Sequence, residues 1–116
     1  MSNLAYLACP YNSPDKGIVA KRFAQATRVA AELLKKKIFV FSPITHGAAL
    51  IEHGGLKAGW DNWAEYDRTI IERCDKVIVL MLPGWEFSKG VMAEIEIAKE
   101  LGKLVEYLDP NEFIYP

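Results

Sequence analysis

The sequence predicts an α/β fold, with one parallel β-sheet of four to five strands and helices on both faces. Short apolar runs alternate along the chain with longer segments whose apolar residues recur at helical spacing. This alternation is typical of parallel strands that are joined by helical crossovers. The length of 116 residues fits a single domain, residues 1–116, and neither internal repeats nor a low-complexity linker divides it.

Two strands and a long helix are predicted in the first part of the chain. The short apolar runs at residues 4–9 and 38–41 suit strands that are buried on both faces. Residues 18–36 between them form a predicted helix. Its apolar stripe consists of Phe23, Ala26, Thr27, Ala30, Leu33 and Leu34.

A long connection follows the second predicted strand, from residue 42 to about residue 59. A short helix is expected within it near residues 47–53. Connections of this length in a compact domain are usually functional or mobile. We therefore expect either a functional role or mobility for residues 42–59, and the sequence does not decide between them.

The remainder of the chain repeats the alternation of helices and strands. The predicted elements are a helix at 61–73, a strand at 76–82, a loop at 83–88, a helix at 89–101 and a strand at 104–108. Gly102 follows the last helix, where glycine is favoured, and the tail at 111–116 is expected to add a short edge strand. The complete order is that of flavodoxin-like and Rossmann-like sheets, in which ligands bind beyond the carboxyl ends of the strands.

Composition and charge argue against several classes of partner. The formal net charge is −1, and the basic triplet at 35–37 suits a solvated helix C-terminus better than a nucleic-acid patch. No apolar run is long enough for a membrane span, and the N-terminus lacks the pattern of a signal peptide. Cys9 and Cys74 suggest no disulfide framework. We expect a cytoplasmic protein that binds neither nucleic acid nor membrane.

Two acidic residues fall within the apolar stripes of predicted helices. Glu94 lies three residues after Val91 and four before Ala98, and Asp67 lies four residues after Trp63. Burying a carboxylate is costly unless it is paired or hydrogen-bonded. Two inward acids in a small domain indicate a carboxylate site, although each acid could instead cap a loop amide or pair with an arginine.

The remaining motifs narrow the chemistry open to such a site. His46 and His53 are seven residues apart, unlike the i, i+4 pair of a helical zinc site, and neither GxxxxGKS/T nor GxGxxG occurs. We therefore expect no metal and no cofactor, although a divalent ion bound by the acids stays open. Glycosidic chemistry remains, in which one ionised acid attacks an anomeric carbon and another handles protons.

Three stretches of the chain, AYLACPY, EYDRTIIERCDKVIVL and SKGVMAEIEIAKELGK, resemble in order and spacing the nucleoside 2-deoxyribosyltransferase superfamily. The sequence LPGWE before the last stretch is similar to small phage-type members. The resemblance implies that Glu94 is a nucleophile that forms a covalent deoxyribosyl ester, and that Asp67 assists protonation of the leaving base. It also implies that Tyr6 orients Glu94, where otherwise a core aromatic is the simpler interpretation. A helix N-terminus nearby is expected to keep Glu94 ionised.

The position six residues before Glu94 distinguishes subclasses of this superfamily. Base transferases have there an aspartate that binds sugar hydroxyls. Here Ser88, followed by Gly90, is similar to the nucleoside 5′-monophosphate N-hydrolases, in which a serine binds phosphate. A hydroxyl and free amides at a helix N-terminus attract phosphate, whereas an aspartate would repel it. As an alternative, Ser88 is only an N-cap.

Other candidate substrate contacts follow the predicted strands. Cys9 ends the first predicted strand and Tyr11 follows it, His46 comes after the second strand and Trp85 after the third. Arg22 in the first helix is a candidate phosphate contact, because arginine binds phosphate through two donors. The alternatives are a surface position for Arg22 and a loop histidine without a chemical role for His46.

The three tryptophans, Trp60, Trp63 and Trp85, have two interpretations. They could stack on a nucleobase, or they could pack in the core or at a subunit interface. The resemblance implies assembly as a homodimer or a larger homo-oligomer, with which the apolar tail FIYP is compatible.

The expected function is hydrolysis of the N-glycosidic bond of a (2′-deoxy)nucleoside 5′-monophosphate through a covalent Glu94 intermediate. The partner is then a small-molecule nucleotide or nucleoside. Two alternatives stay open. One is deoxyribosyl transfer between nucleobases, and the other is a nucleotide-binding or sensing module without turnover, because fold alone does not determine function.

Overall fold

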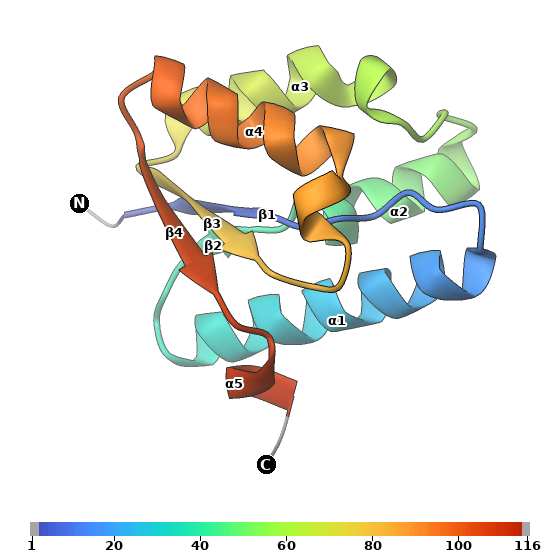
Figure 1. The fold of residues 1–116 in the computed structure, drawn as a ribbon, viewed down its shortest axis with the longest axis horizontal. Coiled ribbons are helices and arrows are strands. Elements are labelled where there is room, and N and C mark those ends of the chain that lie inside the picture. Colours follow the sequence, from blue (N-terminus) through green and yellow to red (C-terminus); the bar gives the residue numbers. More distant parts are fainter. Residues whose placement is uncertain (1–2, 115–116) are drawn as a thin grey trace.

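Four parallel strands form the sheet, in the spatial order β2-β1-β3-β4 (Figure 1). The computed structural model describes residues 3–114 of the chain. The strands are β1 (Ala5–Ala8), β2 (Val40–Phe41), β3 (Lys76–Leu80) and β4 (Leu104–Leu108). Because β1 pairs with both β2 and β3, the strand order reverses between β1 and β3. In open α/β sheets such a reversal creates a crevice at the carboxyl ends of the strands.

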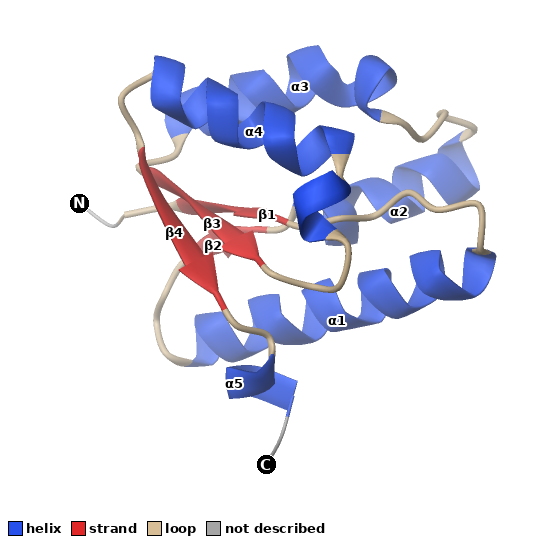
Figure 2. Cartoon of the chain, in the orientation of Figure 1, coloured by secondary structure: helices blue, strands red, loops and turns tan. Residues whose placement is uncertain are grey.

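Helices cover both faces of this sheet (Figure 2). The helices are α1 (Lys16–Lys35), α2 (Pro43–Gly54), α3 (Trp60–Arg73), α4 (Lys89–Glu100) and α5 (Asn111–Ile114), and a 3₁₀ turn, η1 (Trp85–Phe87), precedes α4. α1 and α5 lie on one face, whereas α3 and α4 pack side by side on the other (Figure 1). The predicted fold is thus confirmed, with four strands. Within residues 3–114, no helix is both long enough and apolar enough to cross a bilayer.

Strand β1 separates the core into two halves, because alternate side chains of a strand point to opposite faces. Leu7 is fully buried on the side of α1, together with Val29. Tyr6 is fully buried on the opposite side, in the cluster beneath α3 and α4 that contains Ile71 and Val91. The hydroxyl group of Tyr6 therefore lies under the two helices that bear the inward acids.

The buried face of α1 differs from the predicted stripe. Phe23 and Leu34 are 37% and 47% exposed, whereas Val29 is fully buried. The short strands cover only the second half of this 20-residue helix, so its buried residues begin at Ala26. Leu34 follows the buried Leu33 directly, and successive residues are about 100° apart around a helix.

The connection after β2 is more regular than expected. α2 begins at Pro43, ahead of the helix expected near residues 47–53. The side chain of Ser42 accepts a hydrogen bond from the Thr45 amide (3.3 Å), and proline is favoured in the first turn of a helix. A serine–proline pair after a strand was therefore the available signal for this start.

The expected fifth strand was wrong for the described part of the tail. Residues 111–114 form α5, because the Asp109 carboxylate accepts a hydrogen bond from the Asn111 amide (2.9 Å) and starts a turn there. Tyr115 and Pro116, which belonged to the same expectation, lie outside the described residues. Within residues 3–114, β4 is therefore an edge of the sheet.

Candidate active site

A pocket of about 510 Å³ opens at the carboxyl edge of the sheet, beside the reversal of strand order between β1 and β3. The loop after β1, helix α2 and the first turns of α3 and α4 supply its walls. This is the position at which open α/β sheets bind ligands. Six residues predicted as site residues line it: Glu94, Asp67, Ser88, Gly90, Cys9 and Tyr11.

Two acids line this pocket although they are almost fully buried. Glu94 of α4 is 5% exposed and Asp67 of α3 is 7% exposed. Tyr6 of β1 lies behind them, and its hydroxyl donates a hydrogen bond to Glu94 Oε2. The structure thus brings together the three residues predicted as the catalytic group, from three separate elements.

Burial raises the pKa of both acids, because the charged form loses its hydration. The pKa of Glu94 rises to about 8, where the charge of Asp67 adds to the effect of burial and the hydrogen bond from Tyr6 opposes it. The pKa of Asp67 rises to about 6, and Tyr6 again opposes the effect of burial. Between these two values the pair holds one shared proton.

The pKa of Tyr6 is raised well above its usual value, first by burial and then by the two carboxylates. Its hydroxyl therefore keeps its proton and remains a hydrogen-bond donor. A donor of this kind stabilises the ionised form of the carboxylate that accepts from it. Tyr6 thus partly offsets the cost of ionising Glu94 inside the protein.

The start of α4 does not keep Glu94 ionised, contrary to the expectation from sequence. α4 begins at Lys89, so Glu94 lies in its second turn, whereas the helix dipole acts mainly within the first turn. Burial dominates and moves the pKa of Glu94 in the opposite direction. In the free protein near neutral pH, ionised Glu94 is therefore the minor form.

One oxygen of Asp67 has no partner. Asp67 Oδ1 is buried and makes no hydrogen bond within residues 3–114. Buried polar atoms are nearly always hydrogen-bonded, and an unsatisfied one is unfavourable. Because Asp67 lines the pocket, this oxygen can hold a proton or accept a hydrogen bond from a bound ligand.

Two of the three tryptophans form a wall of the pocket. The indole of Trp63 donates to the Lys57 carbonyl (2.8 Å), and its ring packs against α2 at Gly47, where a Cβ atom would lie 3.4 Å from it. Trp60 packs beside Gly90, at 3.8 Å from the position of a Cβ atom there. These rings offer flat apolar surface to a planar ligand.

The start of α4 supplies the polar part of the pocket. Ser88 is the N-cap of α4, and its hydroxyl accepts a hydrogen bond from the Val91 amide (3.2 Å). A hydroxyl that accepts can still donate its own proton. Because Ser88 also lines the pocket, the cap and the ligand contact are compatible. The first amides of a helix lack intrahelical partners and suit an anion.

Arg22 lies outside the pocket lining and holds two loops together. Its guanidinium donates to the carbonyls of Asn12 (3.0 Å) and Pro83 (3.0 Å), and more weakly to that of Tyr11 (3.4 Å). These carbonyls belong to the loops after β1 and β3. Arg22 thus positions two loops that line the pocket, whereas its sequence position suggested direct contact with phosphate.

His46 and Trp85 also lie outside the pocket lining. His46 Nε2 is 3.0 Å from the Tyr66 hydroxyl, and the two rings stack at 6.1 Å. The ring of Trp85 packs against Tyr107 of β4, with centroids 5.7 Å apart. Position after a strand thus predicted the correct edge of the sheet for both residues, but their side chains point toward other elements.

Cys9 and Tyr11 line the pocket as expected from their position after β1. The Cys9 thiol donates to the Pro10 carbonyl (3.4 Å), and burial raises its pKa far above the usual value. A thiol that stays protonated is a poor nucleophile. Cys9 therefore contributes to the shape of the pocket.

Among the polar and aromatic residues of the pocket, sequence reasoning did not identify Asn12, Asp61, Asn62 and Phe87. Asp61 and Asn62 lie in the first turn of α3, which opens at the same edge as the first turn of α4. That shared orientation of helices in a parallel sheet was the available signal. Phe87 is 90% exposed, so no burial pattern could indicate it. Within residues 3–114, no three His, Cys, Asp or Glu side chains are grouped to hold a metal ion.

The loop before α4 requires glycine at position 84. Gly84 has a φ of 90°, and a Cβ atom there would lie 2.8 Å from Arg22 Nη2. We expect Gly84→Ala to lower the thermal midpoint of unfolding, since left-handed backbone costs a non-glycine residue about 1–2 kcal/mol and the clash displaces Arg22.

Gly102→Ala provides a matched control for this substitution. Gly102 has a φ of 69°, and nothing lies within 4 Å of a Cβ atom there. Thermal unfolding of both variants should show the larger loss for Gly84→Ala. Equal losses would mean that the methyl group added at position 84 does not displace Arg22.

Most of the chain matches a known protein family. Residues 3–109 match a family that is described as a domain of unknown function, DUF1937. None of the curated proteins matches the chain. The matched residues include β1, α3 and α4, and therefore all three members of the buried group, Tyr6, Asp67 and Glu94.

Proposed function

The chain belongs to the DUF1937 family, and from its candidate site we propose that it hydrolyses the N-glycosidic bond of a 2′-deoxynucleoside 5′-monophosphate. One observation supports this most strongly. Two nearly buried acids, Glu94 and Asp67, line one pocket from different helices, and a buried tyrosine hydrogen-bonds one of them. Retaining hydrolysis of a glycosidic bond requires two acids with separate roles.

In the first proposed step, ionised Glu94 attacks the anomeric carbon of the sugar. A carbon–oxygen bond forms, the bond to the base nitrogen breaks, and its electron pair leaves with the base. Asp67 donates its proton to the base, which departs neutral. Tyr6 holds the attacking carboxylate in orientation through its hydrogen bond.

In the second proposed step, water resolves the ester. Asp67, now ionised, accepts a proton from water as the oxygen attacks the anomeric carbon. The bond to Glu94 breaks, which restores its carboxylate, and the products are the free base and deoxyribose 5-phosphate. Asp67 thereby regains the proton that it donated, so the cycle closes without a cofactor.

The rest of the pocket fits the other parts of such a substrate. The indoles of Trp60 and Trp63 can stack on the base. At the start of α4, the Ser88 hydroxyl and the amides of Lys89 and Gly90 can bind the phosphate. The volume of about 510 Å³ lies within the range of small-molecule sites.

Incubation with a panel of nucleosides and nucleoside 5′-monophosphates tests this function directly. Chromatography should detect free base from at least one 2′-deoxynucleoside 5′-monophosphate. A second base added to the mixture distinguishes hydrolysis from transfer, because a transferase would form the exchanged product faster than free sugar. Tight binding without any free base would contradict catalysis and favour a nucleotide-binding module.

Ser88 allows a test of the phosphate. We expect Ser88→Asp to lower kcat/KM for the monophosphate far more than for the nucleoside, because the added carboxylate repels only the charged substrate. Ser88→Ala should cost the monophosphate roughly one hydrogen bond to a charged group, about 1.5–3 kcal/mol. Both constants should be measured for both substrates.

The aspartate variant also separates phosphate binding from helix capping. Aspartate caps a helix N-terminus about as well as serine, whereas alanine costs about 1 kcal/mol of stability. If Ser88 acted only as a cap, Ser88→Asp would resemble the parent protein and Ser88→Ala would affect both substrates alike. That outcome would contradict the phosphate site.

A further inference from the structure

We propose, on the basis of the nucleotide hydrolysis proposed above, that Asp61 determines specificity for the anionic group of the substrate. In the free protein the Asp61 carboxylate pairs with Lys89 at the pocket. When the substrate binds, its phosphate takes the place of Asp61 on the Lys89 ammonium. Asp61 thus competes with the phosphate and sets how strongly the pocket favours charged over neutral substrates.

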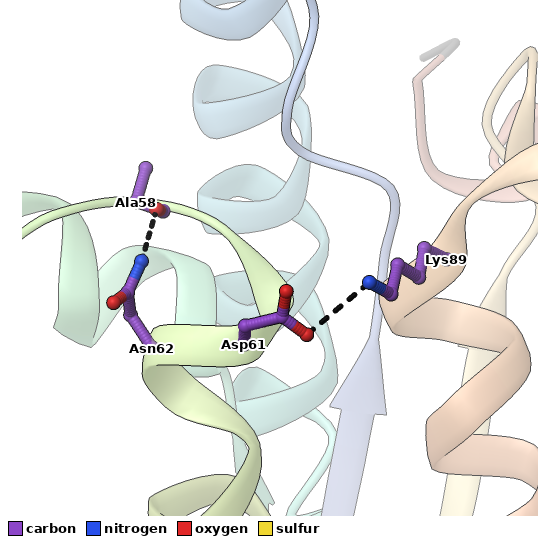
Figure 3. A network of polar contacts seen from close by, with 4 residues as sticks. All are labelled: Ala58, Asp61, Asn62 and Lys89. Carbon is purple, nitrogen blue, oxygen red and sulfur yellow. Dashed lines mark hydrogen bonds and ion pairs between the residues drawn. The ribbon is translucent and has the colours of Figure 1, made fainter.

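The ion pair joins the starts of two helices (Figure 3). Asp61 lies in the first turn of α3 and Lys89 is the first residue of α4, and Lys89 Nζ is 3.2 Å from Asp61 Oδ1. Both residues line the pocket. The side chain of Asn62 donates to the Ala58 carbonyl (2.9 Å) and holds the turn that presents Asp61.

Lys89 is the only basic residue that lines the pocket within the described part of the chain. Arg22, the other candidate for a phosphate contact, uses its guanidinium on three backbone carbonyls. A phosphate at the start of α4 therefore has a single full positive charge available from the lining. In the free protein that charge is already paired with Asp61.

Exchange of partners on Lys89 costs little. The side chains of Lys89 and Asp61 are 71% and 83% exposed, and exposed ion pairs contribute little to stability. A phosphate offers more charge and more acceptor oxygens than a carboxylate, and at the start of α4 it also meets helix amides. The substrate is therefore the stronger partner.

Asp61 opposes the phosphate even after the exchange. Its carboxylate stays on the adjacent turn of α3, close to the site that Lys89 serves, and like charges repel. A neutral nucleoside neither displaces Asp61 from Lys89 nor is repelled by the Asp61 carboxylate. The ratio of kcat/KM for the monophosphate to kcat/KM for the nucleoside should therefore depend on the charge at position 61.

Asp61→Asn is the central variant. We expect it to raise that ratio by about two- to fivefold, the factor that corresponds to an exposed ion pair, and the rise should shrink at high salt. Lys89→Met should lower the ratio. In the Lys89→Met background, Asp61→Asn should produce a smaller rise, because no cation remains to be released.

The other ion pair between the same helices provides a matched control. Arg68 of α3 and Glu100 of α4 are 3.0 Å apart, and neither residue lines the pocket. Glu100→Gln removes this pair and should leave the ratio unchanged. If Asp61→Asn, like Glu100→Gln, left the ratio of the two kcat/KM values unchanged, the Asp61–Lys89 pair would only connect two helices. That result would overturn the proposal.

Binding of inorganic phosphate separates this proposal from the proposed reaction. Calorimetric titration should show tighter binding of phosphate by Asp61→Asn than by the parent protein, whether or not either releases base. Equal affinities would overturn the role of Asp61 while leaving hydrolysis intact. Tighter phosphate binding without base release from any substrate would support the role of Asp61 and contradict the hydrolysis.

Discussion

Replacing Glu94 by glutamine should abolish base release while the fold is retained. An amide cannot form the glycosyl ester, and loss of a nucleophile typically lowers kcat by more than about 10⁴-fold. The amide oxygen can still accept the hydrogen bond from Tyr6, so the buried group keeps its packing. Chromatography of free base, with single-turnover amounts of the protein, measures the loss.

Glu94→Gln should also change how stability depends on pH. The pKa of Glu94 is about 8 in the folded protein and 4.5 as its ordinary value, so between these values the folded state binds more protons than the unfolded state. Stability of the parent protein therefore falls as the pH rises through this range. Glutamine does not ionise, so the variant should be the more stable protein at about pH 8, and the difference should vanish below the ordinary pKa.

Glu96→Gln is the control for both measurements. Glu96 lies two residues further along α4, is exposed and approaches Lys99 to 3.8 Å. It should retain the activity and the stability profile of the parent. Mass spectrometry should detect a trapped sugar adduct on the parent protein and none on Glu94→Gln. Near-normal turnover by Glu94→Gln would contradict the covalent mechanism.

The sequence was sufficient for the architecture because the signals of a parallel sheet are local. Fully apolar runs such as 77–80, separated by amphipathic helices, determine both the strands and the crossovers. Details that depend on one side-chain hydrogen bond were harder to predict. The hydrogen bond from the Asn111 amide to Asp109 begins a helix in the described part of the tail. The hydrogen bond from the Thr45 amide to Ser42 begins α2 earlier than expected.

The acids were predictable, whereas several of their neighbours were not. Glu94 and Asp67 interrupt apolar stripes, so helical periodicity alone places them on buried faces. For Arg22, His46 and Trp85, sequence position gives the edge of the sheet but no side-chain direction. Their directions depend on partners far away in the sequence, such as the Pro83 carbonyl for Arg22.

The protonation states of the two acids could be assigned only with the structure. Helix position suggested an ionised Glu94, but nearly complete burial outweighs the dipole and raises its pKa above that of Asp67. Two expectations, a homo-oligomer and a cytoplasmic location, remain predictions. The edge strand β4 leaves Leu104 and Tyr107 60% and 51% exposed, which is compatible with a partner surface.

Replacing Asp67 by asparagine should slow base release by about 10²–10⁴-fold, the usual contribution of a general acid. Asparagine keeps the size of the side chain but cannot supply a proton to the leaving base. Glu65→Gln, an exposed position in α3, is the control and should keep the parent rate. An unchanged rate for Asp67→Asn would make Asp67 a structural acid.

The pH dependence of the parent protein follows from the shared proton. The reaction needs Glu94 ionised and Asp67 protonated, which is one of the two forms of the pair that hold a single proton. With rising pH, kcat/KM should therefore increase as the first proton leaves and decrease as the second leaves. The two limbs should have pKa values of about 6 and about 8. The productive form is the minor one, because Asp67 loses its proton more readily than Glu94.

Asp67→Asn should convert this bell into a single rising limb. Only the ionisation of Glu94 then controls the rate, so activity increases with pH and reaches a plateau. The pKa of this limb should lie below the value of about 8 for Glu94 in the parent protein, because the negative charge of Asp67 raises the pKa of Glu94 and the substitution removes that charge. A kcat/KM profile of the variant that keeps its alkaline fall would show that another group supplies the proton, and Asp67 would then lose its assigned role.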